Sequence, residues 1–111
     1  MPETPCRLEY YIDDKGREPF REWLYGLRDR AAIARITARP GRVELGNPGI
    51  CKEVGGGVLE LKIDYGPGYR VYFARSGKTV VLLLSGGDKS TQARDIETAK
   101  AYWASHRGKK P

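Results

Sequence analysis

Two cationic side chains, Lys62 and Arg70, flank a glycine-rich segment and could together bind a phosphate group. The residues around them, Leu59–Ile63 and Tyr69–Phe73, alternate between apolar and polar types, as strands with one buried face do. Arginine stays protonated and can hold two phosphate oxygens at once, whereas lysine changes its protonation state more readily when other cations crowd it. The pair therefore has the chemistry to stabilise charge on a phosphate and to move a proton.

Both cations should point to the same side of the sheet. Side chains alternate along a strand, and residues paired across two strands share a face. A five-residue loop over 65–69 satisfies both rules, with two apolar cross-strand pairs: Ile63 with Val71 and Leu61 with Phe73. Four polar residues are then expected together on the face away from the helices: Lys62, Asp64, Arg70 and Tyr72.

A plainer interpretation of these charges stays open. Antiparallel sheets commonly have one solvated face. Glu60 and Asp64 would then form surface ion pairs with Lys62 and Arg70, and such pairs contribute little to stability.

A third cation, Lys89, lies in the segment Ser85–Ser90, which follows an apolar strand and precedes a helix start. Helix N-termini attract phosphate, and Ser90 or Thr91 can cap the helix. The alternative is that the glycines only allow a tight turn and that Lys89 is solvated.

Aromatic residues gather near the cations in sequence. Tyr65, Tyr69 and Tyr72 could stack on nucleic-acid bases, although tyrosine also suits strands for packing reasons alone. The one histidine, His106, is expected to be solvated near the C-terminus, which makes a histidine-based triad improbable. Because no Cys or His pair has ligand spacing, we expect neither a metal nor another cofactor.

The composition indicates one basic domain. The 111 residues have 40% hydrophobic and 31% charged content and a net charge of +6, which suggests a polyanion or an acidic protein as partner. The longest apolar run, Val80–Leu84, is too short to span a bilayer, and no signal peptide is visible. Cys6 and Cys51 are expected as reduced thiols in a cytoplasmic protein without a membrane partner.

The predicted fold class is α+β, with the helices on one face of a mostly antiparallel sheet. The strand 79–85 is uniformly apolar and should be central. We place a break in the second helix at Arg39 or Pro40. Residues 1–5 and 107–111 are expected to be flexible tails of a single domain, 1–111. The expected elements are, in order, a strand at 7–12, helices from Pro19 and from Asp29 or Arg30, strands at 50–54, 58–64, 69–75 and 79–85, and a last helix after Ser90 or Thr91.

Three segments, Cys51–Leu61, Asp64–Phe73 and Gly86–Gln92, carry a resemblance to a known family. They resemble RelE/HigB-type toxins of the RelE/ParE superfamily, in particular the subgroup called addiction-module killer proteins. The resemblance covers nearly the whole chain. It implies a RelE-like fold, in which two N-terminal helices and one C-terminal helix pack on a twisted, mostly antiparallel sheet.

The resemblance also implies a function: a ribosome-dependent endoribonuclease that cuts messenger RNA without a metal and belongs to a type II toxin–antitoxin module. By position, Arg70 would stabilise the cleaved phosphate, and Lys62 and Lys89 match basic residues of the family. Because crowded lysines change their protonation state readily, Lys62 could act as base and Lys89 as acid or clamp. The remaining residues expected to bind RNA are Lys52, Tyr65, Tyr69 and Tyr72. The implied partners are messenger RNA, the ribosome and a helix-turn-helix antitoxin encoded nearby.

The chain departs from the family pattern in two places. Glu60 stands where some relatives have a second lysine, and the start of the last helix (Ala93, Asp95 and Ile96) lacks a tyrosine that some relatives place there. The identity of the acid and the base therefore stays open. Two other functions also stay open: a ParE-like poison of DNA gyrase, and a non-catalytic relic that binds RNA or antitoxin.

Overall fold

The computed structural model describes residues 7–44, 51–77 and 80–108. The α+β class and the predicted order of elements are confirmed. The elements are β1 (Arg7–Tyr10), α1 (Pro19–Tyr25), α2 (Arg30–Glu44), β2 (Cys51–Gly55), β3 (Val58–Ile63), β4 (Tyr69–Ser76), β5 (Val80–Gly87), a 3-10 turn (Lys89–Thr91) and α3 (Gln92–Gly108).

The strands form one mixed sheet in the order β1-β5-β4-β3-β2. The edge strand β1 runs parallel to β5, whereas the other three pairs, β5 with β4, β4 with β3 and β3 with β2, are antiparallel. The strand β5 is an inner strand, as its uniformly apolar sequence predicted, and Val81 to Leu84 are buried.

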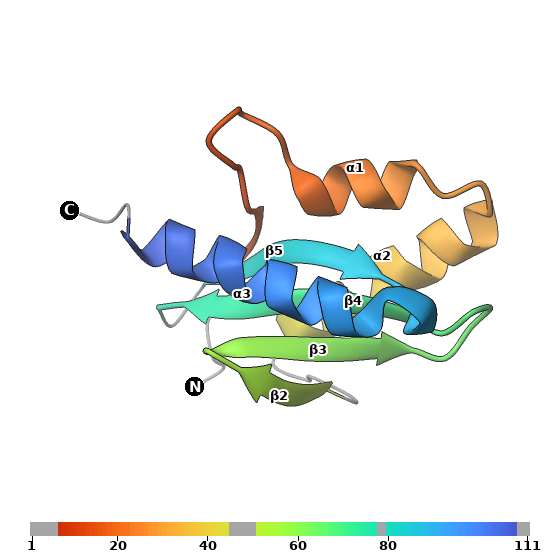
Figure 1. Ribbon diagram of the computed structural model, residues 1–111. Helices are drawn as coiled ribbons and strands as arrows, with labels where there is room; N and C mark the ends of the chain where they lie inside the picture. Colours follow the sequence, from red (N-terminus) through yellow and green to blue (C-terminus); the bar gives the residue numbers. More distant parts are fainter. Residues whose placement is uncertain (1–6, 45–50, 78–79, 109–111) are drawn as a thin grey trace, which may run out of the picture.

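Helices cover both faces of the sheet, so the prediction that they share one face is wrong (Figure 1). Helices α1 and α2 pack on one face, and α3 packs on the other. The reason lies in β4 and β5, because both sides of these strands carry buried side chains: Val71 and Phe73 face α1 and α2, whereas Tyr72 and Ala74 face α3. A sheet that is apolar on two faces needs a layer on each.

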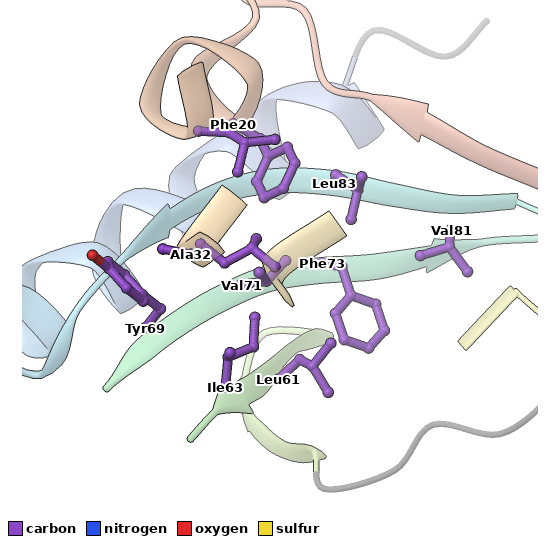
Figure 2. Packing of buried hydrophobic residues seen from close by; sticks show 11 residues of the cluster. Phe20, Ala32, Leu61, Ile63, Tyr69, Val71, Phe73, Val81 and Leu83 are labelled. Atoms are coloured by element: carbon purple, nitrogen blue, oxygen red, sulfur yellow. The ribbon is translucent and has the colours of Figure 1, made fainter. Parts of the chain in front are cut away.

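The larger of the two cores lies between the sheet and the two N-terminal helices (Figure 2). The predicted apolar stripe supplies Phe20 and Leu24 of α1, which are buried, Trp23 of α1, which is partly buried, and Leu27, which follows α1 and is also partly buried. Figure 2 shows the side chains from the sheet and helices that meet there: Phe20, Ala32, Leu61, Ile63, Tyr69, Val71, Phe73, Val81 and Leu83. This core fixes which face of β3 and β4 remains for polar residues.

The helix α2 begins at Arg30, as predicted, because Asp29 caps it. Oδ1 of Asp29 accepts hydrogen bonds from the backbone N–H groups of Ala31 (2.9 Å) and Ala32 (3.2 Å). The predicted break at Arg39 or Pro40 is wrong, since the helix continues through Pro40 to Glu44. A proline removes one backbone hydrogen bond, which can bend a helix without ending it when the turns on both sides are formed.

The last helix, α3, begins at Gln92, directly after Thr91, as predicted. A 3-10 turn that the sequence analysis did not predict precedes it, and Asp88 caps this turn: its Oδ1 accepts from Ser90 N at 2.8 Å, and Thr91 completes the capping box. The helix α3 continues to Gly108, two residues into the segment 107–111 that was expected to be flexible. Residues 1–5 and 109–111 lie outside the described residues.

Two glycines at the end of β5 let both helical layers approach the sheet closely. A Cβ on Gly86 would lie 2.7 Å from Cδ2 of Trp23 in α1. A Cβ on Gly87 would lie 2.8 Å from Cγ of Asp95 in α3. Neither position tolerates a side chain without a shift, so these glycines serve packing rather than the tight turn considered from the sequence.

Candidate active site

The β3–β4 hairpin brings the two predicted cations directly opposite each other. Lys62 pairs with Arg70, Leu61 with Val71 and Ile63 with Tyr69. The loop has five residues, as predicted, but spans 64–68, so the predicted pairing is displaced by two positions along the strand. Because a displacement of two preserves the alternation of side chains, the predicted face of Lys62, Arg70 and Tyr72 is correct.

Lys62 and Arg70 border a hollow of about 210 Å³ on the face that α3 partly covers. The base and walls come from β2, β3 and β4, and Gln92 closes one side from the first turn of α3. Lys52 and Lys62 are exposed at its border. The lining residues are Cys51, Lys52, Glu60, Lys62, Arg70 and Gln92. The prediction that this face is free of helices is therefore wrong, since α3 forms one wall.

Arg70 is the most buried cation of the hollow, with 7% of its surface exposed. Its Nη1 donates to the carbonyl oxygen of Gly68 at 2.7 Å. Its Nε lies 3.7 Å from Oε2 of Glu60 and is buried without a hydrogen-bond partner. A guanidinium held on both sides in this way is preorganised, which is the requirement for stabilising charge on a phosphate.

Glu60 forms a buried network that the sequence analysis missed. It is 5% exposed, and its Oε2 accepts hydrogen bonds from the hydroxyl of Tyr72 (3.1 Å) and from Nε2 of Gln92 (2.9 Å). The interpretation of Glu60 and Arg70 as a surface ion pair is therefore wrong. The signal that could have found the network is the pairing of Glu60 opposite Tyr72, two residues from Arg70.

The pKa of the Tyr72 hydroxyl is raised above its usual value of 10.0, first because the residue is buried and then because the Glu60 carboxylate lies beside it. In the unfolded protein this phenol ionises near pH 10, whereas in the folded protein it stays neutral to higher pH. Its contribution to stability is therefore fully present below pH 10 and is lost as the pH rises further.

We therefore expect Tyr72→Phe to cost about 1–2 kcal/mol at pH 7, since a hydrogen bond to a charged group is lost. The difference between wild type and Tyr72→Phe should shrink above pH 10. Urea unfolding of both proteins between pH 7 and pH 11 measures it. A difference that grows with pH would contradict the assigned burial of a neutral phenol.

Lys89 is exposed and does not line the hollow, but it lies near Gly68 in the loop before Arg70. A Cβ on Gly68 would lie 3.3 Å from Nη1 of Arg70 and 3.8 Å from Cβ of Lys89, so the two residues flank the same backbone segment. The structure thus brings Arg70, Lys62 and Lys52 to one hollow and Lys89 to its neighbourhood. Asp88 directly precedes Lys89, and the pKa of its carboxyl group is lowered mainly by hydrogen bonds from Ser90.

The predicted tyrosines do not gather around the cations. Tyr65 and Tyr69 lie on the opposite side, where the Tyr65 hydroxyl donates to Asp29 at 3.0 Å and Tyr69 packs edge-on against Trp23. Tyr72 is on the side of the hollow but is fully buried under α3. Asp64 is exposed in the loop after β3.

Other predicted features can be placed as well. The imidazole of His106 stacks on Trp103 at 5.7 Å between ring centres, and the residue is half-buried, so the predicted solvated histidine is only partly exposed. Cys51 is a free thiol, and Cys6 lies outside the described residues. Within 7–44, 51–77 and 80–108, no group of three or more His, Cys, Asp and Glu residues could hold a metal ion. No helix in these ranges is long and apolar enough to cross a membrane.

Comparison with known proteins places the chain in a family. Residues 22–104, from α1 into α3, match the family described as phage derived protein Gp49-like. Over 81 residues, the chain is 49% identical to an "Uncharacterized protein" of Haemophilus influenzae, an alignment that covers 73% of this chain and 82% of that protein. The matched range contains every residue of the hollow. The chain therefore belongs to the Gp49-like family, a family of RelE/HigB-like toxins.

Proposed function

We propose that the protein is the toxin of a type II toxin–antitoxin module and acts as a HigB-like, ribosome-dependent endoribonuclease on messenger RNA. One observation carries the proposal: in a chain of this family, Arg70 and Lys62 lie opposite each other at a hollow of about 210 Å³. A hollow lined by cations is the kind of surface that binds a sugar–phosphate link.

The chemistry needs no metal. The 2′-hydroxyl of the RNA attacks the adjacent phosphorus, and the bond from phosphorus to the 5′-oxygen breaks, which gives a 2′,3′-cyclic phosphate and a 5′-hydroxyl. In our proposal Lys62, in its neutral form, accepts the proton of the 2′-hydroxyl, and Lys89 donates a proton to the leaving oxygen. Arg70 stabilises the charge that grows on the phosphate oxygens, and Lys52 binds a neighbouring phosphate.

The proposed partners follow from the charge. A net charge of +6 favours both RNA and an acidic antitoxin, and a helix-turn-helix protein encoded nearby would be the second component of the module. We place the protein in the cytoplasm, where both RNA and ribosomes are.

Induction in growing bacteria, followed by mapping of RNA 5′-ends, tests the function. We expect discrete cuts with 5′-hydroxyl ends inside a translated reporter message and none in the same message without its start codon. Altered plasmid supercoiling without cuts would favour a gyrase poison. The absence of both cuts and altered supercoiling would favour a non-catalytic relic. Either outcome would overturn the proposed ribonuclease.

A further inference from the structure

We propose that Glu60 is a positioning residue that fixes the guanidinium of Arg70 at the wall of the hollow. This inference rests on the proposed function, because the group that Arg70 would meet there is a phosphate of RNA. It assigns a role to the position at which some RelE/HigB-like relatives are expected to have a lysine.

The carboxylate of Glu60 is itself held in place. Three groups reach the same oxygen, Oε2: the hydroxyl of Tyr72 at 3.1 Å, Nε2 of Gln92 at 2.9 Å and Nε of Arg70 at 3.7 Å. They come from β4 and from α3, so the carboxylate is anchored to the sheet and to the helix above it. With only 5% of Glu60 exposed, water does not replace these partners.

The guanidinium of Arg70 lies between two acceptors. Gly68 accepts from Nη1 at 2.7 Å on one side, and the Glu60 carboxylate faces Nε on the other. Two acceptors on different edges restrict rotation of a planar group. Nε of Arg70 is buried and makes no hydrogen bond, and the carboxylate of Glu60 forms the ion pair with it. Loss of that partner would leave the guanidinium free to turn about its bond to Gly68.

A positioning role and a simple charge effect predict opposite results. Removal of any carboxylate raises the net charge above +6, which by charge alone strengthens binding to RNA. A misplaced catalytic group, in contrast, lowers the rate, and an error of about 1 Å can cost about 100-fold. The loss of a carboxylate should therefore increase activity if Glu60 only repels phosphate, and decrease it if Glu60 positions Arg70.

The test compares Glu60→Gln with Glu53→Gln. Both substitutions remove one negative charge and keep the side-chain shape, but Glu53 is exposed on β2 and does not line the hollow. We expect Glu53→Gln to cleave a translated message at the wild-type rate. We expect Glu60→Gln to cleave it about 10- to 100-fold more slowly while binding a 2′-O-methyl oligoribonucleotide at least as tightly as wild type.

A second measurement needs neither cleavage nor RNA. The NMR signal of the Arg70 Nε–H group reports its surroundings, and we expect it to move and to exchange faster with water in Glu60→Gln but not in Glu53→Gln. If Glu60→Gln does not fold, Gln92→Ala removes one of the donors to Oε2 and should cause a smaller change of the same kind.

The two proposals can fail separately. Wild-type cleavage by Glu60→Gln, or an unchanged Arg70 Nε–H signal, would overturn the positioning role and leave the ribonuclease standing. A wild-type protein that cuts no message would overturn the proposed function and, with it, this inference.

Discussion

Arg70→Ala should reduce RNA cleavage by about 100- to 1,000-fold, because one preorganised donor to the transition-state phosphate is lost. Cells that express this variant should therefore grow where wild type arrests them. The measurement is the cleavage rate of a translated message with purified ribosomes, combined with growth after induction. A suitable control is Arg28→Ala, which removes the same charge from an exposed position between α1 and α2.

Stability has to be separated from activity for this variant. Arg70 is buried against Glu60, and removing one partner of a buried ion pair leaves an uncompensated charge that costs about 3–5 kcal/mol. Arg70→Lys keeps the charge but not the planar two-donor geometry, so it should remain folded and still lose most of the cleavage. Folded Arg70→Lys with wild-type cleavage would contradict the proposed role of the guanidinium.

Gly86→Ala should destabilise the fold by about 3 kcal/mol, at the upper end of the usual range for overpacking. The added methyl would lie 2.7 Å from Cδ2 of Trp23, and the rigid indole can move away only by loosening its packing beside Phe20 and Tyr69. Thermal or urea unfolding measures the loss.

Gly108→Ala is the matched control, because a Cβ on Gly108 at the end of α3 has no atom within 4 Å. The double variant Gly86→Ala with Trp23→Ala should be less destabilised than the sum of the two single variants, since the shortened residue makes room for the methyl. Additive effects would show that the clash is not the cause.

The elements of the fold could be predicted because each has a local signal. Pro19 and the apolar spacing after it fix α1, and Asp29 supplies the cap of α2. The placement of α3 could not be read in the same way. Tyr72 and Ala74 follow the alternation of a solvated face, and only the helix above them makes these small or amphipathic residues part of a core.

The candidate site was predictable only in part, for a related reason. Alternation along β3 and β4 places Lys62 and Arg70 on one face in the predicted register and in the observed one, because the two registers differ by two residues. The partnership of Glu60 with Gln92 joins a strand to a helix across 32 positions, and no local pattern carries that information. Tyr65 was expected near the cations only because it is close to them in sequence, whereas its hydroxyl contacts Asp29, 36 positions away.

The parallel neighbours β1 and β5 have a consequence for synthesis of the polypeptide. Arg7 lies beside Val80, so β1 leaves the ribosome long before β5, which is its neighbour among the described strands. Contacts between such distant parts of a chain form slowly, because a long loop must close first. A nascent molecule thus stays incomplete until translation of its own message is nearly finished.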